Sequence, residues 1–450
     1  MRGERAVVLG ASMAGLLAAR VLADFFDTVL VVERDVLPTA ASSRRGVPQG
    51  RHAHLLWGSG VSIIEGLFPG FVDGILSDGA TYFDGDLSRV YISTGGHPLP
   101  PSGHIDDFRF MSPSRPLLEC HVRRRVSDSP NIEICDGHDI AELIAAHGHV
   151  SGALIRARDG RSDRAVEADL VVDAMGRGGR TPAFLDGMGY GRPAEESLDV
   201  RLMYSSVPLR LPATALSEVG VIVGPVAGRP AGLALLSNEN DTSMFTAYGM
   251  AGLEPPTGFS EMLAFITDFT PPHVVKAMRA GEAAGEGAQH RMPSTRWRRY
   301  DKMRRWPTGL LAIGDAICSF NPIYGQGMTV AALEAKCLQD CLLEGTDHLQ
   351  RRYFRATAKP IGNAWQLASG GDLSLPEIEG PRPLPVRLVN DYLKHAQAAS
   401  RSDALVAHRL TRVAGLIDAP IRLLHPEVAA RVAVAGLKRR RGAPSAADAV

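Results

Sequence analysis

Two glycine-rich segments, far apart in the chain, have residue types and a spacing that could bind a dinucleotide. The first reads Gly10-Ala-Ser-Met-Ala-Gly15, close to the pattern G-x-G-x-x-G. In that pattern the first glycine makes a tight turn, the second lets the backbone approach a pyrophosphate, and the third packs a helix against a strand. The second position here is Ser12, whose small side chain still admits the phosphate and can donate to it. We therefore predict cofactor contacts from Gly10, Ser12, Met13, Ala14 and Gly15.

The second segment runs from Gly314 to Met328 and reads Gly-Asp-Ala-Ile-Cys-Ser-Phe-Asn-Pro-Ile-Tyr-Gly-Gln-Gly-Met. A Gly-Asp pair followed by such a loop and a helix start is typical of the segment that holds the ribityl chain and ring of a flavin. Together the two segments predict an FAD enzyme. The residues that we assign to the cofactor here are Gly314, Asp315, Pro322, Gly325, Gln326, Gly327 and Met328.

The elements that must position the first segment can be recognised on both sides of it. Residues 6–9 form a short apolar run typical of a buried parallel strand, and residues 16–22 have helical spacing with strong helix formers. A second strand at 28–32 ends at Glu33, 23 positions after Gly10. A carboxylate there can accept from both ribose hydroxyls and would repel a 2′-phosphate. We assign Glu33 and its neighbour Arg34 to the cofactor site.

A third glycine-rich turn follows the apolar strand predicted at 169–172. Asp173 ends this strand, and Gly176-Arg-Gly-Gly-Arg180 follows it. We place Asp173 in the cofactor site, but a carboxylate at a strand end often caps the next turn, and the sequence supports both roles equally. A helix predicted to start near 115, after the potential cap Ser114, carries Arg115.

Composition limits the kinds of partner. Lys plus Arg equals Asp plus Glu at 49 each, so no bulk charge attracts nucleic acid or an anionic membrane, and we expect a small molecule instead. Five cysteines without metal-ligand spacing predict no metal site and a reducing, cytoplasmic environment. No apolar run approaches the roughly 20 residues of a membrane helix.

Both ends of the chain allow a second interpretation. Arg2 and Arg5 before an apolar stretch resemble a signal peptide, but Arg20 and the acidic end of the second strand follow without a cleavage-like break. The basic run at 438–441 could suggest RNA binding, but it precedes a short Ala/Ser/Pro-containing tail and favours a solvated C-terminus.

The 450 residues are too many for one core, and we predict an α/β fold in three parts. Short apolar runs at 219–223, 231–236 and 244–248 alternate with Pro/Gly turns, which predicts a mainly antiparallel sheet. The parts are a discontinuous Rossmann-like FAD-binding domain (1–75, 105–184 and 291–345), an inserted β-sheet domain for the substrate (76–104 and 185–290) and a helical C-terminal region (346–450).

The three glycine-rich stretches, in this order, resemble those of class A flavoprotein monooxygenases, the group of para-hydroxybenzoate hydroxylase. Within that group, the stretch from Arg45 to His54 and the segments from Arg299 to Met328 are similar to bacterial epoxidases that oxidise polyene intermediates of polyether antibiotics. The resemblance covers about half of the chain and leaves out residues 185–290, which would select the substrate.

The resemblance implies a role for each matching residue. Gly10, Ser12 and Gly15 would face the pyrophosphate, and Glu33 the adenosine ribose. Arg115 would lie near the ribityl and phosphate groups, and Asp315 would accept from a ribityl hydroxyl. Pro322 would lie beside the flavin ring, and the amides of Gly327 and Met328 would stabilise negative charge at N1 and O2.

The resemblance also implies the reaction. NADH or NADPH would reduce FAD, O2 would add at flavin C4a, and the distal oxygen of the resulting hydroperoxide would pass to a hydrophobic, polyketide-like substrate by epoxidation or hydroxylation. Epoxidation requires no catalytic acid or base, and we name none. For phenol hydroxylation His52 and His54 are the nearest candidate bases, although ordering of the loop explains them better. Arg45 and Arg51 could pair with the pyrophosphate or the nicotinamide phosphate, or be surface arginines.

An alternative is a natural-product cyclase that keeps FAD as a structural element. The stretch after Asp173 departs from the family pattern, with Ala174 in place of the usual glycine and Gly179 near the usual serine. Because the family links that stretch to both FAD and nicotinamide binding, the departure makes a non-redox role credible. Redox turnover of the flavin would distinguish the two functions.

Overall fold

The computed structural model describes residues 3–160 and 163–442, and the chain divides into two compact units. Three elements each contain a boundary between the units: β13 (Glu195–Arg210), β18 (Ala288–Arg298) and α9 (Leu349–Leu373). The mixture of sheets and helices, with helices at the C-terminal end, confirms the predicted fold class. Unit 1 comprises Met1–Ala80, Ser112–Leu198 and Ser294–Trp365, and unit 2 comprises Thr81–Met111, Asp199–Pro293 and Gln366–Val450.

Unit 1 is built on a five-stranded parallel sheet with the strand order β19-β12-β1-β2-β8. The apolar runs at the ends of β1 and β2 are buried, as expected for parallel strands covered on both faces. Helices α1 and α8 pack against each other. The bounds are β1 Gly3–Leu9, α1 Met13–Leu22, β2 Phe26–Val32, α4 Arg115–Ser127, β8 Ile132–Cys135, β12 Leu170–Asp173, β19 Leu310–Ala312 and α8 Gly327–Leu343.

The carboxyl ends of β1, β12 and β19 lie at one edge of this sheet because the strands are parallel. Leu9 is in register with Asp173, and Asp173 with Ala312. The three glycine-rich turns follow these strand ends, so segments far apart in the sequence meet there. Ligands of open α/β sheets bind at this edge.

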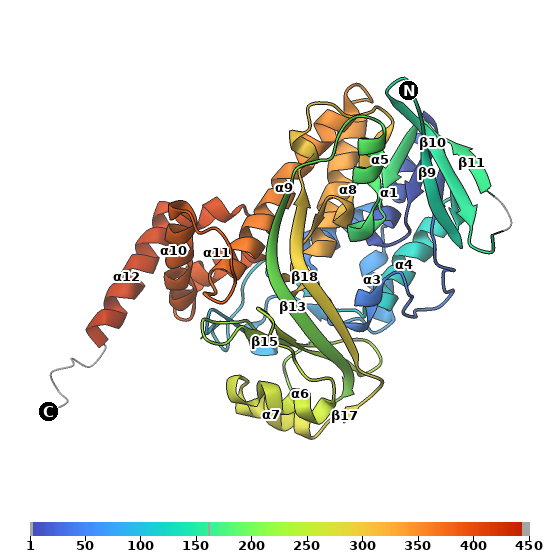
Figure 1. Cartoon of the computed structure of the whole chain (residues 1–450). Coiled ribbons are helices and arrows are strands. Elements are labelled where there is room, and N and C mark those ends of the chain that lie inside the picture. The colour runs from blue at the N-terminus through green and yellow to red at the C-terminus, as the bar shows by residue number, and fades with distance from the viewer. Residues whose placement is uncertain (1–2, 161–162, 443–450) are drawn as a thin grey trace. The chain divides into compact units, whose positions relative to one another are not determined.

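Unit 1 also contains a second, smaller sheet. A three-stranded antiparallel sheet, ordered β11-β10-β9, lies beside the parallel sheet and contacts β12 through β10 (Figure 1). The bounds are β3 Leu56–Trp57, α2 Gly58–Leu67, α3 Phe71–Ser77, β9 His138–Ala146, β10 His149–Ala157, β11 Asp163–Glu167, α5 Thr181–Gly187 and β20 Cys318–Ser319, with 3-10 turns η3 Gly176–Gly178, η6 Gly314–Ala316 and η7 Pro322–Tyr324.

Unit 2 contains a mainly antiparallel sheet in the order β13-β16-β15-β14-β5-β6, in which only the β14–β5 pair is parallel among the described pairings. Helices α6 and α7 cover one face of the sheet (Figure 1). Val207, Leu233 and Phe245 belong to the buried core between that face and the helices. The bounds are β4 Tyr82–Phe83, β5 Val90–Thr94, β6 His97–Pro98, β7 Phe110–Met111, β14 Gly220–Val223, β15 Ala231–Ser237, β16 Ser243–Gly249, α6 Phe259–Ile266, α7 Pro272–Arg279 and β17 Glu282–Ala283.

The C-terminal part of unit 2 is helical, with α10 Leu384–Ser400, α11 Ala404–Ala414 and α12 Pro426–Gly442. These helices share a small core that includes Ala396, Val406 and Val428. The basic run at 438–441 lies at the end of α12, and residues 443–450 lie outside the described residues.

Three further properties of the described ranges bear on function. No single helix in them is long and apolar enough to cross a membrane, although the bent pair α2 and α3 passes that test together. They contain no cluster of three His, Cys, Asp or Glu side chains that could hold a metal ion. All five cysteines are free thiols.

Candidate functional site

The turn between β1 and α1 leaves no room for side chains at its two glycines. Gly10 adopts φ +112°, and its amide donates to the Val32 carbonyl oxygen at 2.7 Å. A Cβ atom at Gly15 would lie 1.9 Å from the Gly10 carbonyl oxygen. The Met13 side chain is buried, whereas Ser12 and Ala14 are half-buried, so Met13 can offer a ligand only its backbone. The turn therefore has the close backbone packing that a pyrophosphate site requires.

Glu33 follows β2, and backbone amides engage both of its carboxylate oxygens. Ala11 N donates to Oε2 at 2.8 Å, and Asp35 N donates to Oε1 at 3.0 Å. The buried side chain thus ties the end of β2 to the turn after β1. Because each carboxylate oxygen can accept more than one hydrogen bond, the predicted contact with ribose hydroxyls stays compatible with this arrangement.

Arg44, which the sequence analysis did not single out, lies at the centre of a buried charge network. Burial alone would lower its pKa, but the carboxylates of Glu119 and Glu33 outweigh that effect and raise it. The side chain is 6% exposed. Its atoms contact Glu119 Oε1 (Nε, 2.7 Å), Glu33 Oε2 and Asp35 Oδ2 (Nη1, 3.2 Å each) and the Ala11 carbonyl oxygen (Nη2, 3.1 Å).

The two predicted arginines of this region, Arg34 and Arg45, are exposed. Arg34 Nε lies 4.0 Å from Asp35 Oδ1. The structure therefore brings Arg44 into the network rather than its neighbour Arg45. The only sequence signal for Arg44 was its place in an Arg-Arg pair, because a loop without periodicity does not indicate which of two adjacent side chains points inward.

Arg115 begins α4 and connects the first glycine turn to the region of Asp315. The Ser114 hydroxyl caps the helix by accepting from Leu117 N at 3.2 Å. Arg115 Nη2 donates to Ser12 Oγ at 2.8 Å. Its Nε lies 3.5 Å from Glu119 Oε2 but makes no hydrogen bond within the described part of the chain. Burial lowers the pKa of Arg115. Because its Nε has no hydrogen-bond partner among the described residues, this buried cation can still bind an anionic or polar ligand.

Asp173 uses both carboxylate oxygens inside its own turn. Met175 N donates to Oδ1 at 2.8 Å, and the Thr181 hydroxyl donates to Oδ2 at 2.5 Å. The side chain is completely buried, and burial raises its pKa. These contacts correspond to the capping role, one of the two that the sequence left open, and the cofactor contact predicted for Asp173 stays a prediction.

Asp315 follows Gly314 in the turn after β19, and the charges of three arginines act on it. Loss of hydration raises the pKa of Asp315, and the charges of Arg115, Arg177 and Arg298 oppose that rise. Arg298 donates to the carbonyl oxygens of Ala316 (2.9 Å) and Arg177 (2.8 Å). Arg177 and Arg298 were not predicted, because their link to Asp315 depends on β18 and η3 meeting the turn.

The loop after Asp315 presents backbone and an open surface. Pro322 and Gly327 are exposed, Gly325 and Met328 are half-buried, and Gln326 is buried. Gly325 adopts φ +63°, and a Cβ atom there would lie 3.0 Å from the Leu55 side chain. Helix α8 begins at Gly327, so the amides of Gly327 and Met328 are in its first turn, where helices leave N–H groups free. This arrangement is suited to a planar ring that needs donors at one edge.

Of the predicted loop histidines, His54 lies within electrostatic reach of Arg115. Its Nδ1 lies 2.9 Å from the His52 carbonyl oxygen. Burial, with a smaller contribution from Arg115, lowers the pKa of His54 to about 4. His52 is buried and Arg51 is exposed. His54 is therefore a neutral imidazole at pH 7, and a weaker base than an unperturbed histidine.

These observations fit a dinucleotide flavin. The glycine turn packs backbone closely against backbone at Gly10 and Gly15, a buried arginine has an unused donor beside the turn, and a helix N-terminus opens next to an exposed proline. All of these features belong to unit 1. We conclude that the carboxyl edge of the parallel sheet is the candidate cofactor site.

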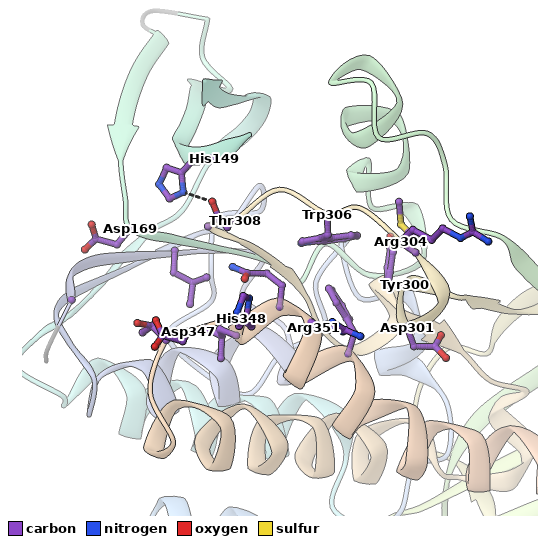
Figure 2. Close-up of a pocket in the computed structure, with 18 of the residues that line it drawn as sticks. His149, Asp169, Tyr300, Asp301, Arg304, Trp306, Thr308, Asp347, His348 and Arg351 are labelled. Carbon is purple, nitrogen blue, oxygen red and sulfur yellow. Dashed lines mark hydrogen bonds between the residues drawn. The ribbon is translucent and has the colours of Figure 1, made fainter. Parts of the chain in front are cut away.

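A pocket of about 960 Å³ lies at the opposite edge of the same sheet (Figure 2). Its lining includes Gly3, Phe26 and Leu170, which are at the amino ends of β1, β2 and β12. Tyr300 and Trp306 contribute rings packed at 5.0 Å between centroids. Because the glycine turns follow the carboxyl ends, this pocket is separate from the candidate cofactor site.

The chain is similar to known proteins over most of its length. No family model matches the chain. The chain is 36% identical over 432 residues to Protein Rv3254 of Mycobacterium tuberculosis, covering 92% of this chain and 90% of that protein. It is 26% identical over 366 residues to kynurenine 3-monooxygenase of Salinispora tropica, covering 80% and 77%.

Solved structures with similar folds have different named activities. The flavin-dependent brominase Bmp2 matches with a TM-score of 0.67 at 15% identity, covering 97% of this chain and 98% of that chain. The p-nitrophenol 4-monooxygenase PnpA of Pseudomonas putida matches with a TM-score of 0.66 at 14% identity, covering 92% of this chain and 98% of that chain. The Diels-Alderase PyrE3 of pyrroindomycin biosynthesis matches with a TM-score of 0.62 at 14% identity, covering 92% of this chain and 81% of that chain.

Proposed function

We propose that this chain, which belongs to the family of Protein Rv3254 and has the fold of class A flavin-dependent monooxygenases, is itself an FAD-dependent monooxygenase. It would insert one oxygen atom from O2 into a hydrophobic, polyketide-like substrate, with NADH or NADPH as the electron donor. The observation that carries the proposal is the meeting of the Gly10–Gly15 turn, Arg115 and the Asp315–Met328 loop at one sheet edge.

Bound FAD would supply the redox chemistry that activates O2. The protein would supply binding and orientation. Gly10, Ser12 and Gly15 would hold the pyrophosphate, Asp315 would accept from the ribityl chain, and the first amides of α8 would stabilise negative charge on the ring. Arg115, with its unused donor, would reach a phosphate or ribityl oxygen.

The substrate assignment is supported by the face of the unit 2 sheet that α6 and α7 do not cover. Because Val207 and Phe245 belong to the core, their alternating neighbours on β13 and β16 point to the other face. That face carries Ser206 and Thr246, whose hydroxyls lie 2.6 Å apart. Around this hydroxyl pair the face carries the uncharged side chains of Tyr204, Met244 and Ala234, and Arg210 follows only at the end of β13. An uncharged stretch with a few hydroxyls suits a neutral, hydrophobic molecule.

The proposal is tested by anaerobic titration of the purified protein with NADH and with NADPH, with and without a panel of polyene and aromatic polyketides. We expect the flavin absorbance to bleach, and a panel member that accelerates bleaching would indicate the substrate class. A bound flavin that stays oxidised with every donor and compound would contradict a monooxygenase. It would instead favour the cyclase, an alternative with which the fold of the Diels-Alderase PyrE3 is compatible.

We expect Asp315→Ala to weaken FAD binding about tenfold to a hundredfold, because it removes an acceptor for a ribityl hydroxyl, and hydrogen bonds to charged groups contribute about 1.5–3 kcal/mol. The measurement is the Kd of FAD by fluorescence titration of the apoprotein. Asp347→Ala is a matched control, because Asp347 is exposed and lines the pocket at the opposite edge of the sheet. An Asp315→Ala protein that purified fully loaded with FAD would refute the assigned role.

A further inference from the structure

Glu334 is a completely buried carboxyl group on α8, directly beneath the turn that presents Asp315. Gly314 N donates to Glu334 Oε2 at 2.6 Å. Gly314 adopts φ +67°, and a Cβ atom there would lie 2.6 Å from the Ala14 Cβ atom. The turn is therefore pressed against α1 on one side and bonded to Glu334 on the other.

No positively charged side chain among the described residues stabilises an ionised Glu334. Its second oxygen, Oε1, has no hydrogen-bond partner among the described residues, and the same is true of the buried Tyr353 hydroxyl. Burial, with repulsion from Asp315, raises the pKa of Glu334 to about 8. The titratable groups that interact with it are Asp315 on η6, Cys318 on β20, Cys337 on α8 and Tyr353 on α9.

Of these groups, the two thiols and the phenol stay neutral through the physiological range. Burial raises the pKa of Cys337 to about 12, and it raises those of Cys318 and Tyr353 well above their usual values. An ionised Glu334 would therefore have an unpaired charged oxygen in apolar surroundings, which is costly. The neutral acid avoids the cost of a buried charge and still accepts from Gly314 N.

We propose that Glu334 is a positioning residue for the cofactor, which holds the Gly314–Asp315 turn as an uncharged acid and weakens FAD binding when it loses its proton. The inference rests on the proposed FAD site. Ionisation would place a second negative charge beside Asp315, close to a cofactor that is itself anionic through its pyrophosphate. Ionisation of Glu334 therefore weakens FAD binding, and bound FAD makes ionisation of Glu334 less favourable.

Thermodynamic linkage gives the sign of the effect. If FAD raises the pKa of Glu334 above its value of about 8 in the free protein, FAD binds less tightly as pH rises through that value. One further unit in pKa corresponds to a tenfold change in Kd. Below about pH 7 Glu334 is protonated with or without FAD, and its contribution is constant.

The test compares the Kd of FAD at about pH 6.5 and about pH 9.5 for the wild type, Glu334→Gln and Glu334→Leu. We expect the wild-type Kd to rise about tenfold. Glu334→Gln keeps an acceptor for Gly314 N but cannot ionise, so its Kd should change less than the wild-type value; any response that remains belongs to Asp315 or other groups. Glu334→Leu removes the acceptor and should bind FAD more weakly than Glu334→Gln at both pH values. Equal pH responses of the wild type and Glu334→Gln would overturn the inference.

A measurement on the apoprotein separates this inference from the proposed function. The infrared band of a protonated carboxylic acid should be present at pH 7 in the wild type, disappear above about pH 8, and be absent from Glu334→Gln. A wild type that showed this band but never bound FAD would refute the FAD site alone. A wild type that bound FAD but lacked the band would refute the uncharged state of Glu334 alone.

Discussion

Replacing Gly15 with alanine is expected to lower the free energy of unfolding by roughly 3 kcal/mol or more and to abolish FAD retention. The new Cβ atom would lie 1.9 Å from the Gly10 carbonyl oxygen and 3.2 Å from the Ala174 Cβ atom. The nearest obstacle is backbone, so no side-chain rotation relieves it. Helix α1 must move away from β1, and that movement opens the turn that would hold the pyrophosphate.

Gly66→Ala is the matched control for this prediction. Gly66 is an exposed helical residue of α2, and a Cβ atom there would meet nothing within 4 Å. We expect its stability to stay the same or to rise by up to about 1 kcal/mol, since alanine is the better helix former. Urea unfolding and the ratio of flavin to protein absorbance measure both variants. A Gly15→Ala protein as stable and as fully loaded as Gly66→Ala would disprove the close approach of α1 to β1.

Arg44→Ala is expected to destabilise the protein by about 3–5 kcal/mol, the cost of removing one partner from a buried ion pair. The substitution leaves Glu33, Asp35 and Glu119 without their shared cation. Glu33 and Asp35 lose their buried cationic partner, whereas Glu119 keeps Arg115 at 3.5 Å and Arg123 at 3.7 Å.

The neighbouring Arg45 provides the control for the Arg44 substitution. Arg45 is exposed, so we expect Arg45→Ala to change the free energy of unfolding by no more than about 0.5 kcal/mol. Arg44→Lys should recover part of the loss, because one ammonium group cannot reach all the acceptors of a planar guanidinium. Equal urea midpoints for Arg44→Ala and Arg45→Ala would show that the buried network contributes nothing to stability.

The sequence predicted the parts of the site that depend on local order. The strand that ends at Glu33, the helix that begins at Arg115 and the helix after Gly327 were all predicted within a few residues, because each combines an apolar period with a recognisable end signal. The three glycine-rich turns could be expected to meet because parallel strands bring their carboxyl ends to one edge.

The contacts that the sequence missed depend on which way a side chain points in the folded chain. Arg44 lies in a loop without periodicity, and Glu334 occupies an ordinary position in a long helix whose inward face is set by tertiary packing. Nothing local distinguishes such a glutamate from a surface residue. For Asp173 the sequence left two roles open, and only the positions of Met175 and Thr181 show that its oxygens are used within the turn.

The division of unit 1 into three chain segments has a consequence for synthesis on the ribosome. Strands β1, β2, β8 and β12 emerge first, but β19 and the Asp315 loop emerge only after residues 199–293 of unit 2. The edge of β12 that pairs with β19 therefore stays unpaired while the inserted sheet of unit 2 is translated and can begin to fold. If FAD binds at this edge, a nascent chain can bind it only after α8 (Gly327–Leu343) has been translated, and a chain truncated before α8 has no means of closing the site.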